Sequence, residues 1–173
     1  MYIDNKKEYL KWILANSKMA NYIDEGNYYD LLKYINKRTG DDYIALRPIF
    51  NEISRALNWD GFIIEDDKLI GYYGVEEDVK IPNGVKYIDE LAFLGCNSIK
   101  SVEIPDGVYE IGAFAFKRCV NLEKVSVPNS INQISTWAFH ECPKLKNITL
   151  PKWFKNITFT IGIDESRVNI TWI

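Results

Sequence analysis

The sequence contains few of the residues that catalytic and metal sites use most. It has one histidine, three cysteines and two methionines among 173 residues. A hydrolase triad needs a nucleophile, a base and an orienting acid together, and the single histidine, His140, has no such set beside it. Phosphate-binding loops of the G-x-x-x-x-G-K-[ST] or G-x-G-x-x-G type do not occur. We therefore expect a protein that is not an enzyme and takes no cofactor.

The sequence also lacks long apolar runs and an excess of basic charge. The longest apolar run in its N-terminal segment is Trp12–Ala15, far short of the roughly 20 residues that span a bilayer. A secretory signal needs a basic start, then a longer unbroken apolar stretch and a small-residue cleavage site, and this segment does not supply that pattern. The formal net charge of −3 gives no footprint for nucleic acid. We expect no membrane span, no nucleic-acid partner and a cytoplasmic location, or a secreted or surface location if a signal has been removed.

An internal repeat dominates the second half of the chain. Four dipeptides of an aliphatic residue and proline begin 23 residues apart: Ile81-Pro82, Ile104-Pro105, Val127-Pro128 and Leu150-Pro151. Other columns keep the same period, and they include Ala92-Phe93, Ala115-Phe116 and Ala138-Phe139, and Cys96, Cys119 and Cys142. A fixed period of 20–50 residues is the signature of repeat architectures.

The repeat predicts a solenoid of stacked coils. In Lys100–Ile104, Val102 and Ile104 alternate with polar residues, which indicates one short strand per repeat with a single apolar face. Proline ends the strand because it lacks the N–H that continues a ladder. A turn and a short helical piece around Ala-Phe are expected to follow. One coil cannot bury its own apolar face, so several must stack.

Three consecutive repeats carry a family resemblance. They read IPNGVKYIDELAFLGCNSIKSVE, IPDGVYEIGAFAFKRCVNLEKVS and VPNSINQISTWAFHECPKLKNIT. This pattern resembles the BspA-type leucine-rich repeat family over about residues 79–154, with Ile99 in place of leucine and Ile131 in place of valine. The resemblance implies a curved, right-handed solenoid that binds proteins or other ligands, often on bacterial surfaces or in phage-borne proteins, and it implies no chemistry.

The flanking segments predict an α+β chain with caps at both ends of the solenoid. Residues 1–60 do not repeat, and apolar spacing indicates helices over about 9–14, 27–36 and 43–57. Residues 61–75 hold two apolar runs around a charged turn, which predicts a β-hairpin. Residues 155–173 are rich in Ile and Thr and are expected to form capping strands. The two domains are therefore 1–60, helical, and 61–173, the solenoid.

The cysteine column has two readings. Three cysteines and His140 supply enough ligands for a zinc site, but zinc ligands usually come in short pairs such as C-x-x-C, and none occurs. Cysteine also behaves as a small buried hydrophobe. We therefore expect stacked core thiols and no metal.

The variable columns give the candidate partner-binding residues. Leu91, Phe114 and Trp137 precede the Ala-Phe dipeptides and form one stripe of large apolar side chains, named here the aromatic stripe. An exposed stripe of this kind marks a partner site, whereas a buried one shields the core or packs on residues 1–60. The polar strand positions that suit a protein contact are Ser101, Glu103, Lys124, Ser126 and Asn147.

Together these features predict a module that binds another protein, as an adaptor or inhibitor, by shape and charge. The charges are unevenly placed, at −5 over residues 65–90 and +5 over residues 117–155. This is either chance scatter on solvated faces or a dipole that steers a partner carrying both signs of charge. A fragment of a surface adhesin is the alternative, and an enzyme within residues 1–60 is the third reading. We expect a monomer or a weak dimer.

Overall fold

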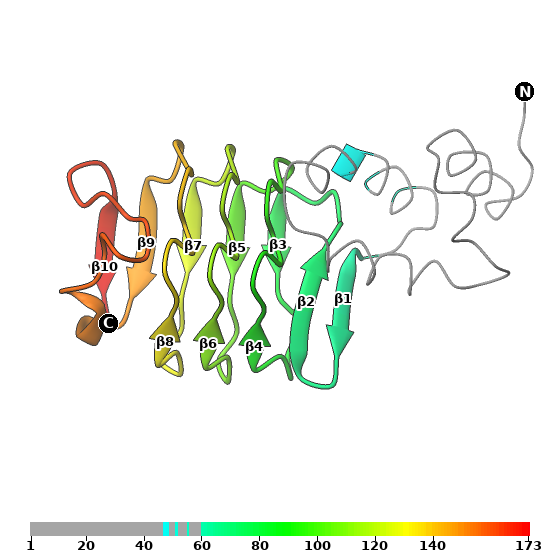
Figure 1. Cartoon of the computed structure of the whole chain (residues 1–173), viewed down its shortest axis with the longest axis horizontal. Coiled ribbons are helices and arrows are strands. Elements are labelled where there is room, and N and C mark those ends of the chain that lie inside the picture. Colours follow the sequence, from blue (N-terminus) through cyan, green and yellow to red (C-terminus); the bar gives the residue numbers. More distant parts are fainter. Residues whose placement is uncertain (1–46, 49–50, 52–54, 56–59) are drawn as a thin grey trace, which may run out of the picture.

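Each 23-residue repeat folds into one coil that contributes a strand to each of two sheets (Figure 1). The computed structural model describes residues 47–48, 51, 55 and 60–173. The first sheet runs β10-β9-β7-β5-β3 and is parallel throughout. Its strands are β3 (Asp78–Lys80), β5 (Ser101–Glu103), β7 (Lys124–Ser126), β9 (Asn147–Leu150) and β10 (Asn169–Trp172). The predicted solenoid with its 23-residue period is confirmed.

A second sheet, which we did not predict, forms on the other side of each coil. It runs β1-β2-β4-β6-β8. Its strands are β1 (Phe62–Glu65), β2 (Lys68–Tyr72), β4 (Tyr87–Ile88), β6 (Glu110–Ile111) and β8 (Gln133–Ile134). The two-residue strands are too short for an alternating pattern to reveal, but each buries its isoleucine and pairs in parallel with a strand of a neighbouring coil.

The short helical piece expected around each Ala-Phe dipeptide is wrong. These segments are turns, closed by bonds such as Leu94 N–H to the Leu91 carbonyl at 2.9 Å. Leu91 has a φ of 63°, and its counterparts Phe114 and Trp137 each have 57°. A right-handed helix cannot contain such residues, so the chain turns instead of continuing helically.

Stacked aromatic rings form the spine of the core. Phe93 and Phe116 have ring centroids 4.7 Å apart, and Phe116 and Phe139 have centroids 5.3 Å apart. Tyr72 extends the stack at 5.1 Å from Phe93, and Phe62 follows at 4.8 Å from Tyr72. The last two rings belong to the hairpin, so its aromatics continue the spine of the repeats. All of these rings except Phe62 are buried.

The two ends of the solenoid are closed differently. β1 and β2 pair antiparallel within residues 61–75, and β2 pairs in parallel with β4, so the hairpin extends the second sheet. In residues 155–173, where strands were expected, only β10 is a strand. A 3₁₀ turn, η2 (Lys152–Phe154), and further turns precede it. Gly162 at a φ of 89° and the turn that Asp164 forms with Ser166 divert the chain from an extended path.

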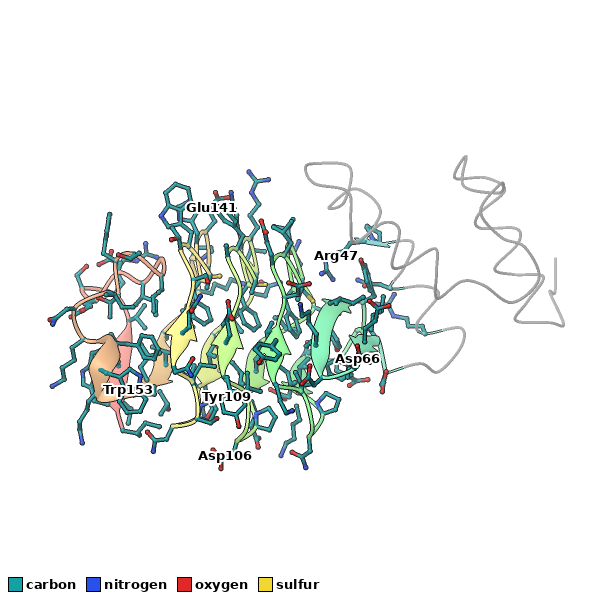
Figure 2. All side chains as sticks on the ribbon, turned by 60° about the horizontal axis from the view of Figure 1, so that its bottom comes forward. Arg47, Asp66, Asp106, Tyr109, Glu141 and Trp153 are labelled. Atoms are coloured by element: carbon teal, nitrogen blue, oxygen red, sulfur yellow. The ribbon has the colours of Figure 1, made fainter. Side chains whose placement is uncertain are left out.

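The helical region predicted for residues 1–60 lies outside the described residues, apart from residues 47–48, 51, 55 and 60. The first four of these are helical. Arg47 is buried, donating from Nε to the Leu94 carbonyl at 2.6 Å and from Nη1 to the Tyr72 carbonyl at 2.8 Å. Its guanidinium also lies 5.4 Å from the centre of the Tyr73 ring. The Arg47 side chain thereby contacts both the hairpin and the first Ala-Phe turn of the solenoid (Figure 2).

Candidate interaction surface

Each Ala-Phe dipeptide lies between two residues in the left-handed conformation. Leu91, Phe114 and Trp137 precede it, and Gly95, Arg118 and Glu141 follow it, all with φ between 57° and 64°. Residues other than glycine adopt this conformation only where surrounding contacts impose it. Here the backbone bonds between coils impose it, since Trp137 N–H donates to the Thr160 carbonyl at 2.8 Å and Phe114 N–H to the Thr136 carbonyl at 3.3 Å.

The aromatic stripe has one well-exposed member. Trp137 is 45% exposed, whereas Leu91 and Phe114 are half-buried. The Trp137 ring meets the Phe114 ring edge to face, with centroids 5.6 Å apart, and stacks on His140 at 5.2 Å. Phe114 also carries the Lys117 ammonium 5.1 Å above its ring. The stripe is thus a supported ridge whose exposed surface is greatest at Trp137.

A small charged cluster lies beside the stripe, around Glu141 (Figure 2). Arg118 Nε donates to Glu141 Oε2 at 2.6 Å, and Lys117 Nζ lies 3.8 Å from Oε1. His140 Nε2 lies 3.3 Å from the same Oε1 atom. The hydrogen bond from Arg118, more than the charges nearby, lowers the pKa of Glu141. The carboxylate is therefore ionised at neutral pH and already partnered.

Next to Trp137 lies a groove of about 720 Å³, named here the Trp137 groove. Its walls include Trp137, Phe159 and Ile163, and its rim carries Asp164 and Glu165. Phe159 is 87% exposed, more than any other exposed large hydrophobic side chain among the described residues. Sequence reasoning missed this site because the repeat pattern breaks after Leu150-Pro151. The useful signal was that Thr160 stands 23 residues after Trp137, which puts Phe159 beside the end of the stripe.

The polar strand candidates form a second surface in a different part of each coil. Ser101, Lys124 and Asn147 occupy adjacent positions across β5, β7 and β9, and Glu103 is opposite Ser126. Ser101 Oγ donates to Asp78 Oδ1 at 2.5 Å, and Glu103 pairs with Lys80 at 3.2 Å. This face is polar and mostly exposed, and two of its five candidates already have partners in the preceding coil.

The cysteine column lies in the core as free thiols. Cys96 and Cys119 are buried and Cys142 is half-buried. Within the part of the chain that the structure describes, no group of three or more His, Cys, Asp or Glu side chains is placed to hold a metal ion. Burial raises the pKa of the Cys142 thiol to about 12 and raises that of Cys119 as well. Both thiols are therefore protonated at neutral pH, as expected for thiols packed in a core.

No helix in the described part of the chain is long and apolar enough to cross a membrane.

The repeats match a known family model. Residues 72–161 match the BspA type leucine rich repeat region in six copies. No curated protein matches the chain.

Several solved structures are similar to parts of the chain. A leucine-rich repeat protein from Bacteroides ovatus is 34% identical with a TM-score of 0.47, over 52% of this chain and 23% of that one. The leucine-rich repeat protein of T. pallidum is 26% identical with a TM-score of 0.48, over 65% and 60%. A leucine rich cell surface protein from Faecalibacterium prausnitzii is 28% identical with a TM-score of 0.39, over 61% and 35%. This chain therefore spans less than two thirds of each of these proteins.

Proposed function

Because the chain belongs to the BspA-type leucine-rich repeat family, we propose that it is a non-enzymatic module that binds another protein. Repeat solenoids are rigid, extended scaffolds whose variable positions create binding surfaces. The observation that carries the proposal is the exposure of Trp137, held in a left-handed turn between Phe114 and His140. Tryptophan is one of the residue types enriched at the hot spots near the centres of protein interfaces.

The proposed mechanism is occupation of a partner surface. The backbone bonds between coils hold the ridge in place before binding, so little conformational entropy is lost on association. A module of this kind acts as an adaptor when a second surface, such as the polar strand face, holds another protein. It acts as an inhibitor when the ridge covers a partner's own site. The partner-binding residues in this proposal are Leu91, Phe114, Trp137, Ser101, Glu103, Lys124, Ser126 and Asn147.

The test is affinity capture with three baits: the wild-type chain, Trp137→Ala and Trp153→Ala. Trp153 is a matched control because it is a tryptophan 57% exposed that lies outside the aromatic stripe and the Trp137 groove. We expect a protein that the wild type and Trp153→Ala retain and that Trp137→Ala loses, with thermal unfolding of all three within a few degrees. Identical sets of captured proteins from the three baits would reject the aromatic stripe as the binding surface.

The polar strand face and the oligomeric state need their own measurements. Lys124→Glu reverses the charge at an exposed position of β7 and is expected to weaken the binding of a second partner without changing stability. The expected monomer or weak dimer is tested by light scattering across a concentration series. The expected cytoplasmic location is tested by fractionation of the source cell.

A further inference from the structure

The walls of the Trp137 groove suit a flat, partly apolar group. Trp137 and Phe159 both line it, and both have exposed faces. The Trp137 ring is fixed by its contacts with Phe114 and His140, so it offers a preorganised stacking surface. Gly162 lines the same groove and contributes no side chain to fill it.

The polar groups of the groove have hydrogen-bond acceptors to spare and few donors. The Ser166 hydroxyl donates to Asp164 Oδ1 at 2.6 Å, and the Ser166 N–H donates to the same oxygen at 3.0 Å. The Thr158 hydroxyl donates to Glu165 Oε1. Both hydroxyl protons are therefore engaged, while Asp164 Oδ2 and Glu165 Oε2 accept no hydrogen bond from any described residue.

The charges of the groove also favour a ligand that donates hydrogen bonds. No lysine or arginine is among the described residues that line the groove, and neither Asp164 nor Glu165 has an ion-pair partner among them. His140, which lines the groove, has its Nε2 atom 3.3 Å from Glu141, which already pairs with Arg118. The hydrogen bonds from Ser166 and, to a lesser degree, the charge of Arg167 lower the pKa of Asp164, but the Arg167 guanidinium lies outside the groove lining and donates to the Pro143 carbonyl at 3.0 Å. A ligand with many donors, a positive charge and a flat face would complement this groove.

We propose that the Trp137 groove binds an arginine side chain presented by a partner protein. This inference rests on the proposed function and specifies the chemistry of the partner's contact. A guanidinium is planar, stacks on tryptophan and donates to carboxylates through two parallel N–H groups. Lysine lacks the flat face. A saccharide has equal need for donors and acceptors, and the groove has its hydroxyl donors already engaged.

The test uses the full chain and two short peptides, acetyl-Gly-Arg-Gly-amide and its citrulline counterpart. Citrulline keeps the shape of arginine and removes its charge. Binding is followed by NMR through the Trp137 indole N–H. We expect saturable shifts with the arginine peptide and at least tenfold weaker binding of the citrulline peptide. Equal affinity for the two peptides would overturn the proposal, and so would saturable binding of an N-acetylglucosamine trimer without binding of the arginine peptide.

A pair of double variants tests the carboxylates. Asp164→Asn with Glu165→Gln removes both charges but keeps an oxygen for Ser166 and for Thr158, so the local turn is retained. Asp66→Asn with Asp106→Asn is the matched control at exposed turns outside the groove. We expect a tenfold or greater loss of arginine-peptide affinity in the first and no change in the second, with unchanged unfolding midpoints in both. Unchanged affinity in the first variant would overturn the inference.

The outcomes separate this inference from the proposed function. A partner captured through Trp137, together with an arginine peptide that does not bind, rejects the arginine site alone. A charge-dependent arginine peptide site, together with identical captured sets from all baits, rejects the aromatic stripe as the partner surface and leaves the groove as a site for a smaller ligand.

Discussion

The thiol of Cys119 donates to the backbone carbonyl of Phe93 in the preceding coil, with sulfur and oxygen 3.1 Å apart. The same carbonyl also accepts the N–H of Cys96 at 3.0 Å. Cys142 repeats the arrangement one coil later, since its sulfur lies 3.1 Å from the Phe116 carbonyl oxygen. The cysteine column therefore adds a weak hydrogen bond to a carbonyl that the turn has already partnered.

Removing this thiol is expected to cost a modest amount of stability. In Cys119→Ala, the Phe93 carbonyl keeps the Cys96 N–H, so the cost comes from the lost weak bond and from a small cavity at a fully buried position. We expect about 1–2 kcal/mol in urea unfolding. Cys142→Ala is the comparison and should cost less, because Cys142 is only half-buried. A larger loss in Cys142→Ala would show that burial does not set the cost.

The same thiols make stability depend on alkaline pH. Burial raises the pKa of Cys142 to about 12, whereas an unfolded cysteine has a pKa of about 8.5. Below that unfolded value both states hold the proton, so the thiol adds no pH dependence. Above it the unfolded chain loses the proton that the folded chain keeps, so stability falls by about 1.4 kcal/mol per pH unit for each thiol, up to the folded pKa.

The measurement is urea unfolding at pH 7.5, 9 and 10 under reducing conditions, for the wild type and for Cys119→Ala with Cys142→Ala. We expect the wild type to lose more stability than the double variant at pH 10, by about 2 kcal/mol from Cys142 and by a further amount from Cys119, whose pKa burial also raises. Tyr72, whose pKa is also raised by burial, is present in both chains and cancels in the difference. Parallel pH profiles would show that the two thiols ionise normally in the folded chain.

The aromatic spine predicts a large effect at its centre. Phe116 is fully buried between Phe93 and Phe139, with which it stacks at interplanar angles of 17° and 7°. Phe116→Leu keeps an apolar side chain but loses both ring contacts, so we expect a loss of about 1–3 kcal/mol. Phe159→Leu, at an 87% exposed ring, is the control and should stay within about 0.5 kcal/mol of the wild type. Equal losses of unfolding free energy in Phe116→Leu and Phe159→Leu, measured in urea, would contradict a core built on stacked rings.

Gly107 and Gly162 have similar φ angles, but substitution by alanine should destabilise the chain to different extents at the two positions. Gly107 has a φ of 97° with open space where a Cβ would lie, so Gly107→Ala is expected to cost about 1–3 kcal/mol from backbone strain alone. Gly162 has a φ of 89°, and a Cβ there would lie 2.8 Å from the backbone nitrogen of His140. Gly162→Ala should therefore lower the melting temperature further than Gly107→Ala. A larger fall in melting temperature for Gly107→Ala would show that the backbone around Gly162 can shift to accommodate the added Cβ.

The sequence alone was enough to predict the solenoid, its period and its core columns. In a stacked repeat, the neighbours of each residue are its counterparts 23 positions away, so columns such as Val79, Val102, Val125 and Ile148 can be read from an alignment of the chain with itself. The 23-residue spacing likewise predicts that Phe93, Phe116 and Phe139 stack on one another in the core. The importance of the aromatic stripe for binding stays a prediction.

Three features came only from the tertiary structure. The two-residue strands of the second sheet exist because neighbouring coils supply their hydrogen-bond partners, and so short a segment has no pattern of its own. Bonds to the next coil impose the left-handed conformation of residues beside Ala-Phe, where the repeat was expected to contain a short helical piece. The Trp137 groove forms where the repeat ends. The period still places Phe159 near the end of the stripe, since Thr160 stands 23 residues after Trp137. Beyond residue 161, where the family match ends, the period no longer says which residues are neighbours, so only the folded chain brings Asp164 and Glu165 beside Trp137.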